Sequence, residues 1–435
     1  MTGQAKSTTS AKLPSESTPV AIVLGGTNPH RALVENLKRR GYHVLLADYL
    51  DAPPAAEVAD EHVRISAMDV EAVYGLAAER KASLVISVCL DRAIPVVAEV
   101  SYRLGLPSIY TPENALRFTD KVLMKQIFEL ANIPTAKSKK IQSLAEAEQL
   151  NLPFPFILKP ADSTGSLGIG IVRNAKELAE TFAYAVSVSD SGVVLAEELL
   201  EGRELSVDCI VADNVCSVIL VRERLIHRLT EGGVQCYGTL SPAPLPDPKA
   251  QEIIGEISAR VSSAFGIVNA PLMVQGYLTK QNEFKVLEIA VRLGGGLSFR
   301  AVHLKTGLDQ VSVALDFSVG ACVNPDIKEV GDVYAIISIY ARGGMLLKVT
   351  GVEGLKNQGV IAEYFPYKPA GTVFADVITA RNRVSAVIIE APDHQVLYTK
   401  IAKLFAGLRV LNTDGRDMLA REIEFVPPPL SMVSK

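Results

Sequence analysis

The sequence predicts a mixed fold, part α/β and part α+β, and two patterns carry this prediction. In the N-terminal part, short apolar runs alternate with helical segments, which is typical of a parallel sheet with crossover helices. After about residue 325, several strand-like runs follow one another and predict a C-terminal β-rich subdomain. The N-terminal strands are expected at 20–24, 43–47 and 83–90, with helices at 29–40 and 94–104; the C-terminal runs are VYAIISIYA, TVFADVI and SAVIIEA.

The first strand and the first helix are joined by the glycine-containing loop GGTNPH, and Gly41 ends that helix. Gly25 and Gly26, with Asp48 after the second strand, allow a dinucleotide-binding site as one interpretation. The fingerprint G-x-G-x-x-G is absent from this loop. We therefore favour glycines that let the backbone turn tightly into the helix or approach a ligand.

The central part of the chain combines a long helix with several strands. The stretch TPENALRFTDKVLMKQIFELANIP predicts one helix, entered after Pro112 and stopped by Pro134, with Asp120 and Lys121 in its middle. Two strands are expected around a turn at Gly202, and one more before the glycines at 294–296. The expected domains are a disordered tail (1–18), an N-terminal α/β domain (19–112), a central domain (113–325) with a small lid at about 135–200, and the C-terminal subdomain (326–435).

Composition favours small-molecule chemistry. The chain has 435 residues, of which 48% are hydrophobic and 21% charged, and a formal net charge of -4. That charge gives no basic footprint for nucleic acid. Five scattered cysteines form no metal-ligand pattern, and the apolar runs have the length of strands, so we expect no membrane span and a cytoplasmic protein.

The stretch FPFILKPADSTGSLGIGIV (154–172) predicts a phosphate-binding hairpin. Lys159 lies at the end of a strand and supplies a positive point charge. The small residues that follow let backbone N–H groups converge on an anion, and their loop could cover phosphates as a lid. The alternative is a surface hairpin with a lysine reaching into solvent. The loop residues proposed to contact the anion are Ser163, Thr164, Gly165, Ser166 and Gly168.

The stretch LAEELLEGRELSVDCIV (195–211) carries four acids around the predicted turn. Strand alternation places Glu197 and Glu198 on opposite faces. One acid could accept a hydrogen bond from an adenine amine, and Glu204 could bind a ribose hydroxyl. Taken in isolation, this stretch is better explained as an acidic hairpin exposed to solvent.

The stretch 273–296 places Glu288 within an otherwise apolar strand, followed by Arg292 at a spacing that keeps it on the same face. A buried carboxylate is costly unless it is paired or binds a metal. Magnesium prefers carboxylate oxygens combined with substrate phosphates. The two residues therefore suit phosphoryl transfer, and a structural Glu288–Arg292 salt bridge is the alternative.

The order of these motifs, from the Lys121 helix to Arg292, resembles the ATP-grasp superfamily over about 300 residues. The resemblance implies an ATP-grasp fold preceded by a parallel-sheet domain. It further implies that Lys121 and Lys159 contact ATP phosphates under the 163–168 loop, and that Arg292 binds a carboxylate or acyl phosphate. For the remaining sites it implies adenine contacts by Glu197 and by the backbones of Glu198 and Leu200, a ribose contact by Glu204, and metal ligation by Glu288 and Gln275.

Two positions depart from the usual pattern of that superfamily. Gln275 stands where a metal-binding Glu is common, and Ala290 stands where Asn is common, which puts a two-metal site in doubt. The E-x-A-x-R form of the Glu288 strand, and less specifically the C-terminal stretch, resemble a branch of amino-acid ligases that make dipeptides.

Two segments are further candidates for the substrate site. The polar connection 222–246 offers His227, Arg228 and Glu231, although His227 alone is better explained as a surface histidine. The segment 294–309 opens with Gly294 and Gly295 and then turns helical, so its first N–H groups could bind an anion. Arg300 and His303 lie on that predicted helix, where ordinary packing and exposure are an equal alternative.

The leading hypothesis is an ATP-dependent ligase that joins an amino-acid carboxylate to an amine through an acyl phosphate. ATP and Mg²⁺, or Mn²⁺ in its place, are the expected cofactors, and amino acids are the expected partners, with neither nucleic acid nor membrane. Homodimers are common in the superfamily, so the resemblance allows one here. The alternatives are a biotin-carboxylase-like or purine-biosynthesis-like enzyme that acts on bicarbonate or formate, and a non-catalytic nucleotide sensor.

Overall fold

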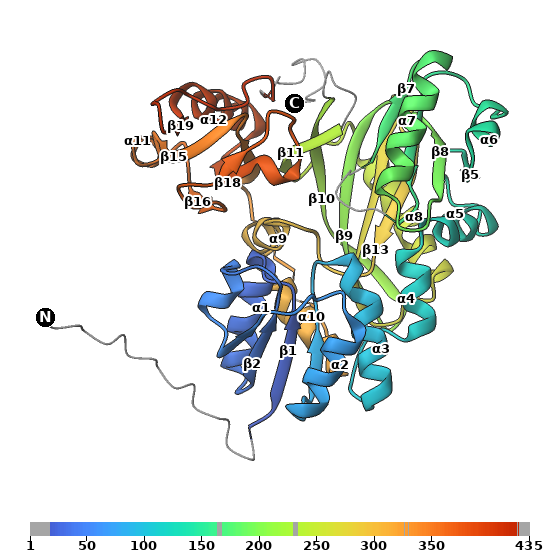
Figure 1. The fold of residues 1–435 in the computed structure, drawn as a ribbon, viewed down its shortest axis with the longest axis vertical. Coiled ribbons are helices and arrows are strands. Elements are labelled where there is room, and N and C mark those ends of the chain that lie inside the picture. The colour runs from blue at the N-terminus through green and yellow to red at the C-terminus, as the bar shows by residue number, and fades with distance from the viewer. Residues whose placement is uncertain are drawn as a thin grey trace, which may run out of the picture. The chain divides into compact units, whose positions relative to one another are not determined.

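The computed structural model describes residues 18–162, 168–228, 234–325, 327–328, 330–423 and 425 (Figure 1). The described chain divides into two compact units. Unit 1 contains the residues up to Thr119 together with Arg292–Phe299 and Asp309–Asn324. Unit 2 contains Asp120–Val291, Arg300–Leu308 and the residues from Pro325 onward.

Unit 1 is built on a four-stranded parallel sheet in the order β3-β2-β1-β4. The predicted alternation of strands and helices is confirmed here, although β3 was not predicted because its three residues, EHV, carry no apolar run. The strands are β1 (Val20–Leu24), β2 (His43–Ala47), β3 (Glu61–Val63) and β4 (Leu84–Ile86); the helices are α1 (Asn28–Arg39), α2 (Val70–Glu79), α3 (Ile94–Leu104), α4 (Pro112–Thr119) and α10 (Gln310–Ser318), with 3-10 turns η1 (Pro54–Glu57) and η2 (Asp91–Ala93).

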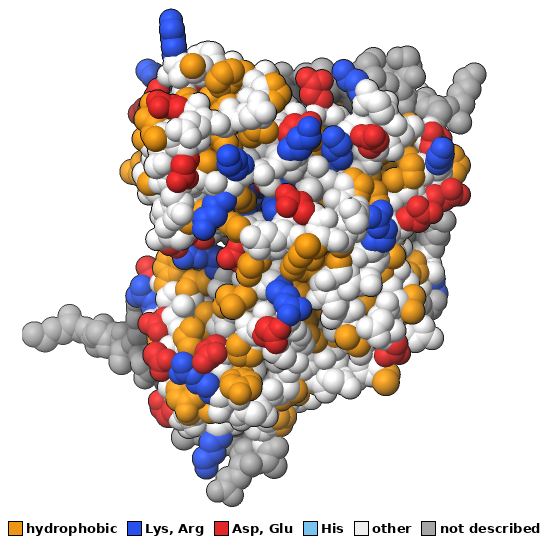
Figure 2. Space-filling model, turned by 90° about the vertical axis from the view of Figure 1, so that its right-hand side faces the viewer, with side chains coloured by type: hydrophobic (Ala, Val, Ile, Leu, Met, Phe, Trp, Pro, Cys, Tyr) orange, Lys and Arg blue, Asp and Glu red, His pale blue; other side chains and the backbone are white. Residues whose placement is uncertain are grey.

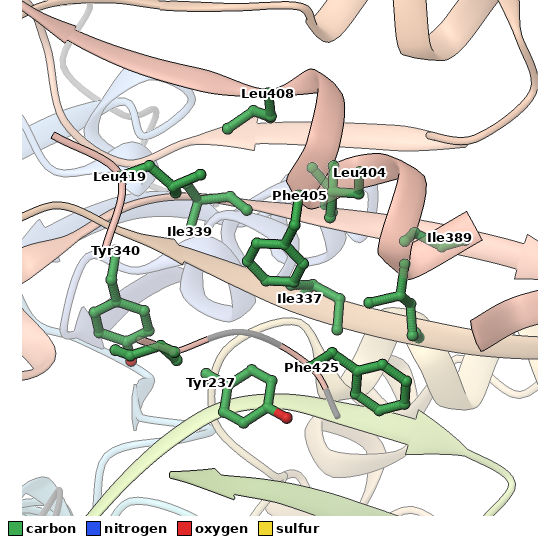
Figure 3. Packing of buried hydrophobic residues seen from close by; sticks show 14 of the residues in the cluster. Tyr237, Ile337, Ile339, Tyr340, Ile389, Leu404, Phe405, Leu408, Leu419 and Phe425 are labelled. Atoms are coloured by element: carbon green, nitrogen blue, oxygen red, sulfur yellow. The ribbon is translucent and has the colours of Figure 1, made fainter. Parts of the chain in front are cut away.

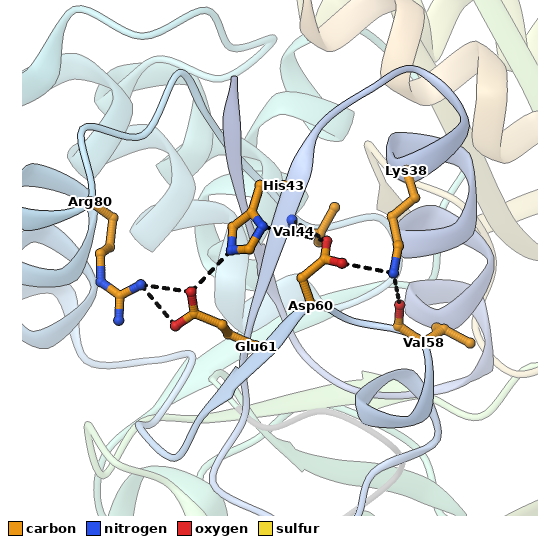
Figure 4. A network of polar contacts seen from close by, with 7 residues as sticks. All are labelled: Lys38, His43, Val44, Val58, Asp60, Glu61 and Arg80. Carbon is orange, nitrogen blue, oxygen red and sulfur yellow. Dashed lines mark hydrogen bonds and ion pairs between the residues drawn. The ribbon is translucent and has the colours of Figure 1, made fainter. Parts of the chain in front are cut away.

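A network of polar contacts lies at the amino ends of the unit 1 strands (Figure 4). At the start of β2, His43 bonds to Glu61, which also pairs with Arg80 at 2.8 Å. Asp60 pairs with Lys38 of α1 at 2.9 Å. Ligands of open parallel sheets bind at the opposite, carboxyl ends of the strands. The network therefore has a structural role, and a ligand site of unit 1 is expected among the loops at the carboxyl ends.

Unit 2 contains a small antiparallel sheet in the order β5-β8-β6-β7, which lies within the predicted lid region. One face packs on helices around a core that includes Phe156, Leu158 and Phe182. The strands are β5 (Ser138–Ile141), β6 (Phe156–Pro160), β7 (Gly170–Val172) and β8 (Val194–Glu198); the helices of this core are α6 (Leu144–Glu148) and α7 (Ala175–Val188), and α5 (Lys121–Leu130) precedes the sheet in the chain.

The larger sheet of unit 2 has eight strands in the order β13-β12-β9-β10-β11-β14-β18-β16, all antiparallel. The predicted C-terminal runs VYAIISIYA and SAVIIEA form β14 and β18 and continue this same sheet. The strands are β9 (Arg203–Ala212), β10 (Val215–Arg228), β11 (Val234–Ser241), β12 (Ala270–Leu278), β13 (Phe284–Ala290), β14 (Val333–Tyr340), β16 (Glu363–Pro366) and β18 (Arg383–Ala391).

A three-stranded sheet, β17-β15-β19, completes the C-terminal part of unit 2. In the hydrophobic core of this part, Phe405 and Leu404 pack against Ile337 and Ile389 of the large sheet (Figure 3). The remaining elements are α8 (Pro248–Ala264), α9 (Ser298–Thr306), α11 (Val352–Asn357), α12 (His394–Gly407), β15 (Gly344–Thr350), β17 (Val373–Phe374), β19 (Arg409–Asn412) and the turn η3 (Ala380–Asn382). The fold is therefore the predicted mixture of a parallel sheet and antiparallel sheets.

The charged side chains drawn in colour in Figure 2 are of both signs and are interspersed. On that face they form no single-sign stripe of the kind that tracks a nucleic-acid backbone. None of the helices in the described ranges combines the length and the apolarity needed to cross a membrane.

Candidate functional site

Glu197 and Lys159 lie on the face of the small sheet of unit 2 that is opposite its helix-packed core. Glu197 of β8 lies opposite Ile157 of β6, and Lys159 lies opposite Leu195. Directly paired residues share a face, and so do residues two apart, so all four side chains are on one face. The hairpin β6–β7 predicted around the phosphate loop is present, because Phe156 to Leu158 pair with Val172 to Gly170.

Glu197 is the centre of a buried charge cluster. Its Oε1 lies 2.9 Å from Lys159 Nζ and 3.3 Å from Lys125 Nζ, and the exposed fractions of the Glu197, Lys125 and Lys159 side chains are 3%, 5% and 10%. Burial alone would raise the pKa of Glu197, but Lys159 and Lys125 hold it below its usual range. Glu197 is therefore ionised and forms ion pairs with two lysines. The predicted adenine role of Glu197 did not include these ion pairs.

Lys125 was missed in the sequence, although a signal was present. It lies four residues after Lys121, and residues four apart share one side of a helix. Its Nζ also donates to Thr135 Oγ1 at 2.8 Å, and that hydroxyl donates to Val286 O of β13 at 2.6 Å.

Lys121 and Glu288 lie near one another in unit 2. Lys121 Nζ is 3.9 Å from Glu288 Oε2. The prediction of one helix with Lys121 in its middle is wrong: α4 ends at Thr119, and Asp120, in extended backbone, caps α5 by accepting from Val122 N and Leu123 N. Lys121 is therefore the first residue of a helix. Glu288 is 35% exposed, less buried than the apolar strand around it suggested.

The large sheet holds Glu204 through three donors. Arg224 Nε lies 2.6 Å and Gln275 Nε2 2.8 Å from Glu204 Oε1, and Tyr277 OH lies 2.9 Å from Oε2. Gln275 pairs directly with Glu288 across β12 and β13. The predicted ribose residue and both predicted metal ligands thus lie on adjacent strands of one sheet.

The acidic stretch 195–211 is not a hairpin, which corrects the sequence interpretation. β8 pairs with strands of the small sheet, whereas β9 pairs with β10 and β12 of the large sheet, so residues 199–202 cross from one sheet to the other. At the crossover Gly202 has φ +144°, and a Cβ there would lie 2.2 Å from Leu278 O. Leu200 is buried in this segment, and Glu198 N donates to Lys137 O at 2.9 Å.

A magnesium ion would find few protein ligands here. Among the described residues, no three His, Cys, Asp or Glu side chains converge as a metal cage. Magnesium in nucleotide enzymes often uses only one or two carboxylates plus substrate phosphates. Glu288, half-exposed beside the Gln275 amide, fits that simpler requirement.

Arg292 belongs to unit 1, and β13 ends at Ala290, so the alternation expected to carry it onto the face of Glu288 does not extend that far. It forms a two-pronged ion pair with Asp91, with Nε 2.8 Å from Oδ1. Leu293 N donates to Val88 O, which joins this segment to the end of β4. Asp91 was missed because the sequence gives no reason to connect it with a residue about 200 positions later.

The carboxyl edge of the unit 1 sheet also holds buried groups. The His30 ring bonds to Ser87 Oγ at 3.1 Å, and burial lowers its pKa to about 3, so it is neutral at pH 7. Nearby, burial raises the pKa of the Cys89 thiol to about 11. A Cβ on Gly25, at φ +101°, would lie 2.8 Å from the His30 ring, so the first glycine of the loop permits close packing of this histidine.

The candidate substrate residues belong to different elements of the two units. His227 is half-buried on β10, opposite Gln235. Arg300 forms a two-pronged ion pair with Glu363 at 2.8 and 3.0 Å, whereas His303 on the same helix is exposed. Gly294 and Gly295 precede α9, as predicted.

Several predicted residues lie outside the described residues, namely Ser163, Thr164, Gly165, Ser166 and Glu231. Of the predicted phosphate loop, Gly168 is described, with φ +78°. A Cβ at this position would lie 2.5 Å from the Pro160 ring, so the loop re-enters its hairpin where only glycine fits.

Comparison with known proteins finds sequences that are similar to this chain. Residues 120–324 match the sequence profile of the carbamoyl-phosphate synthase L chain ATP-binding domain. The L-arginine-specific L-amino acid ligase of Bacillus subtilis is 25% identical over 58% of this chain, and the match spans 62% of that relative's length, which is less than two thirds. Alanine–anticapsin ligase of Bacillus subtilis is 24% identical over 67% of the chain and 66% of the relative.

Solved structures show the same fold over nearly the whole chain. An L-amino acid ligase from Bacillus licheniformis superposes with a TM-score of 0.77 at 18% identity, covering 92% of this chain and 100% of that one. A phosphoribosylglycinamide synthetase from Anaerococcus prevotii gives a TM-score of 0.71 at 17% identity, covering 91% and 100%. Together with the profile match to residues 120–324, these likenesses show that the chain has the fold of ATP-grasp ligases.

Proposed function

We propose that the protein is an ATP-dependent ligase that joins the carboxylate of an amino acid to an amine, forming a dipeptide or a related amide through an acyl phosphate. ADP and phosphate are the other products. The proposal takes its substrate class from the sequence form E-x-A-x-R and from the activities that the names of the two Bacillus subtilis relatives give.

One connected set of contacts supports phosphoryl transfer at this site. Lys159 and Lys125 share Glu197, and Lys125 is linked through Thr135 to Val286. Glu288 follows Val286 by two residues on the same strand, and its Oε2 lies 3.9 Å from Lys121 Nζ. Cations held in fixed positions stabilise the charge that develops on a transferred phosphoryl group.

The residue roles within this proposal follow their chemistry. Lys121 and Lys159 bind ATP phosphates, and Glu204, held by three donors, accepts from a ribose hydroxyl. The adenine amine is bound near Glu197 and Glu198, with backbone groups of the crossover reading the ring edge. Arg292, which Asp91 holds in a two-pronged ion pair, is the candidate for binding the carboxylate.

Glu288 and the Gln275 amide oxygen would hold magnesium, which supplies charge neutralisation on the phosphates when bound. Lys121 is near enough to Glu288 to act as its counterion when no cation is present. The substrate residues proposed from the sequence, His227, Arg300 and His303, remain candidates for choosing the amino acid.

ADP formation should depend on both an amino acid and magnesium. Full-length protein is incubated with MgATP and each member of a panel of amino acids, with formate and bicarbonate as further arms, and ADP is measured. We expect ADP well above background with at least one amino acid, and loss of that signal with EDTA. ADP formed only with bicarbonate or formate would favour the other enzyme class, and ATP binding with no ADP in any arm would favour a sensor.

The reaction should transfer oxygen from the substrate carboxylate to inorganic phosphate. An acyl phosphate forms by attack on the γ-phosphorus, so one carboxylate oxygen leaves with phosphate when the amine attacks. With the carboxylate labelled in oxygen-18, mass spectrometry should find one labelled oxygen per phosphate released. Label in AMP, with pyrophosphate as the other product, would contradict the acyl-phosphate route.

A further inference from the structure

Lys125 is the one member of the buried cluster to which neither the motifs nor the comparisons give a role. Its ammonium group is committed to the protein through two contacts, Glu197 Oε1 at 3.3 Å and Thr135 Oγ1 at 2.8 Å. Its side chain is only 5% exposed. A lysine held in this way is poorly placed to reach a ligand, so its contribution must act through its partners.

The contacts of Lys125 join three parts of unit 2. Lys125 is on α5, Glu197 on the small sheet, and Thr135 is bonded to Val286 of the large sheet. An isolated bridge between Thr135 and Val286, with Val286 N donating to Pro134 O at 2.7 Å, fixes that connection. The strand that Thr135 contacts is the strand that carries Glu288.

The two lysines of the cluster differ in what they are able to do. Within the part of the chain that the structure describes, Lys159 has its polar contact with Glu197, at 2.9 Å. When Lys159 turns toward a phosphate, it weakens that ion pair. Without Lys125, Glu197, with a 3% exposed side chain, would then be an uncompensated buried charge, which is strongly destabilising.

We propose that Lys125 is a positioning residue for nucleotide binding, which keeps Glu197 neutralised and tied to Thr135 so that Lys159 can engage a phosphate. This inference deepens the proposed function and rests on its assignment of Lys159 to ATP. Lys125 lowers the free energy that is needed to move the Lys159 ammonium group from Glu197 to the nucleotide. This effect is present only while Glu197 is charged.

A double-mutant cycle tests this dependence on Glu197. The wild type, Lys125→Met, Glu197→Gln and the double variant are compared by calorimetric titration with Mg²⁺ and a non-hydrolysable ATP analogue. Lys125→Met should weaken binding by about ten-fold or more in the wild-type background, because it leaves a buried partner charge. In the Glu197→Gln background, the same change should weaken binding by less than about two-fold, because no charge remains to be neutralised.

Turnover supplies a second readout that a purely structural role would not change selectively. Lys125→Met should raise KM for ATP by about ten-fold, and KM for the amino acid should stay within about two-fold of wild type. Lys139→Met, an exposed lysine on β5 opposite Ala196, is the matched control and should behave as wild type. If Lys125→Met does not fold, Lys125→Gln, which retains a donor for Thr135, takes its place in the cycle.

The outcomes separate this inference from the proposed function. Equal losses from Lys125→Met in both backgrounds, or no loss in either, would overturn the role of Lys125. A wild type that binds the analogue with the expected non-additive cycle, but forms no ADP with any amino acid, would overturn the proposed function and leave the role of Lys125 in place. A wild type that does not bind the analogue would overturn both.

Discussion

Replacing Glu288 by Gln should lower kcat/KM by roughly 100- to 1,000-fold, or about 3–4 kcal/mol of transition-state stabilisation. The amide has nearly the shape of the carboxylate but lacks its charge, which weakens its hold on a magnesium ion. Glu288 is partly exposed and 3.9 Å from Lys121, so folding should lose no more than about 1 kcal/mol. The measurements are steady-state kinetics at several magnesium concentrations and unfolding in urea.

A matched control lies just before the same strand. Glu283 is exposed, and Glu283→Gln removes an equal charge away from the site, so it should retain wild-type activity. Excess magnesium should recover part of the Glu288→Gln loss if metal affinity is what the substitution reduces. A Glu288→Gln protein that is largely unfolded, with normal activity in its soluble fraction, would show that Glu288 is structural.

Local patterns in the sequence predicted the elements that are defined by their own residues. The apolar runs 20–24 and 43–47 are β1 and β2 without any change of boundary, because buried parallel strands are continuous apolar runs. The order of lysine strand, glycine loop, acidic segment and acid strand predicted the ATP-grasp fold, and the fold comparisons confirm it.

Sequence pattern failed where a contact joins distant segments. The acidic segment looks like a hairpin because a turn at Gly202 separates two strands, but the two strands hydrogen-bond to different sheets. That choice depends on partner strands far along the chain. The Arg292–Asp91 pair has the same origin, because it connects residues that only the folded unit 1 brings together.

Asp120 shows a local failure of a different kind. The stretch around it has helical periodicity on both sides, and this favoured one helix. The Asp120 side chain accepts two backbone N–H groups, which satisfies the orphan donors at the start of α5 and makes a helix boundary favourable here. The Asp-Lys pair was therefore a capping signal, and it makes Lys121 the first residue of α5.

Replacing Lys159 by Met should lower kcat/KM for ATP by roughly 100- to 1,000-fold, because a cation that contacts the transferring phosphate stabilises charge formed in the transition state. The Met side chain has a similar length and fills the same buried space. Glu197 keeps Lys125 at 3.3 Å as a counterion, so the loss of folding stability should be smaller than the catalytic loss. Steady-state kinetics and urea unfolding measure the two effects, with Lys139→Met as the matched control.

Glu197→Gln distinguishes the two buried lysines. If Lys159 contacts the phosphate directly, its cation is needed whether or not Glu197 is charged, so Lys159→Met should remain severely impaired in the Glu197→Gln background. Lys125, by contrast, should become dispensable there, because its proposed role is to neutralise Glu197. Recovery of activity in the Lys159→Met, Glu197→Gln double variant would mean that Lys159 serves only as a counterion, and the phosphate contact would have to be assigned to another cation.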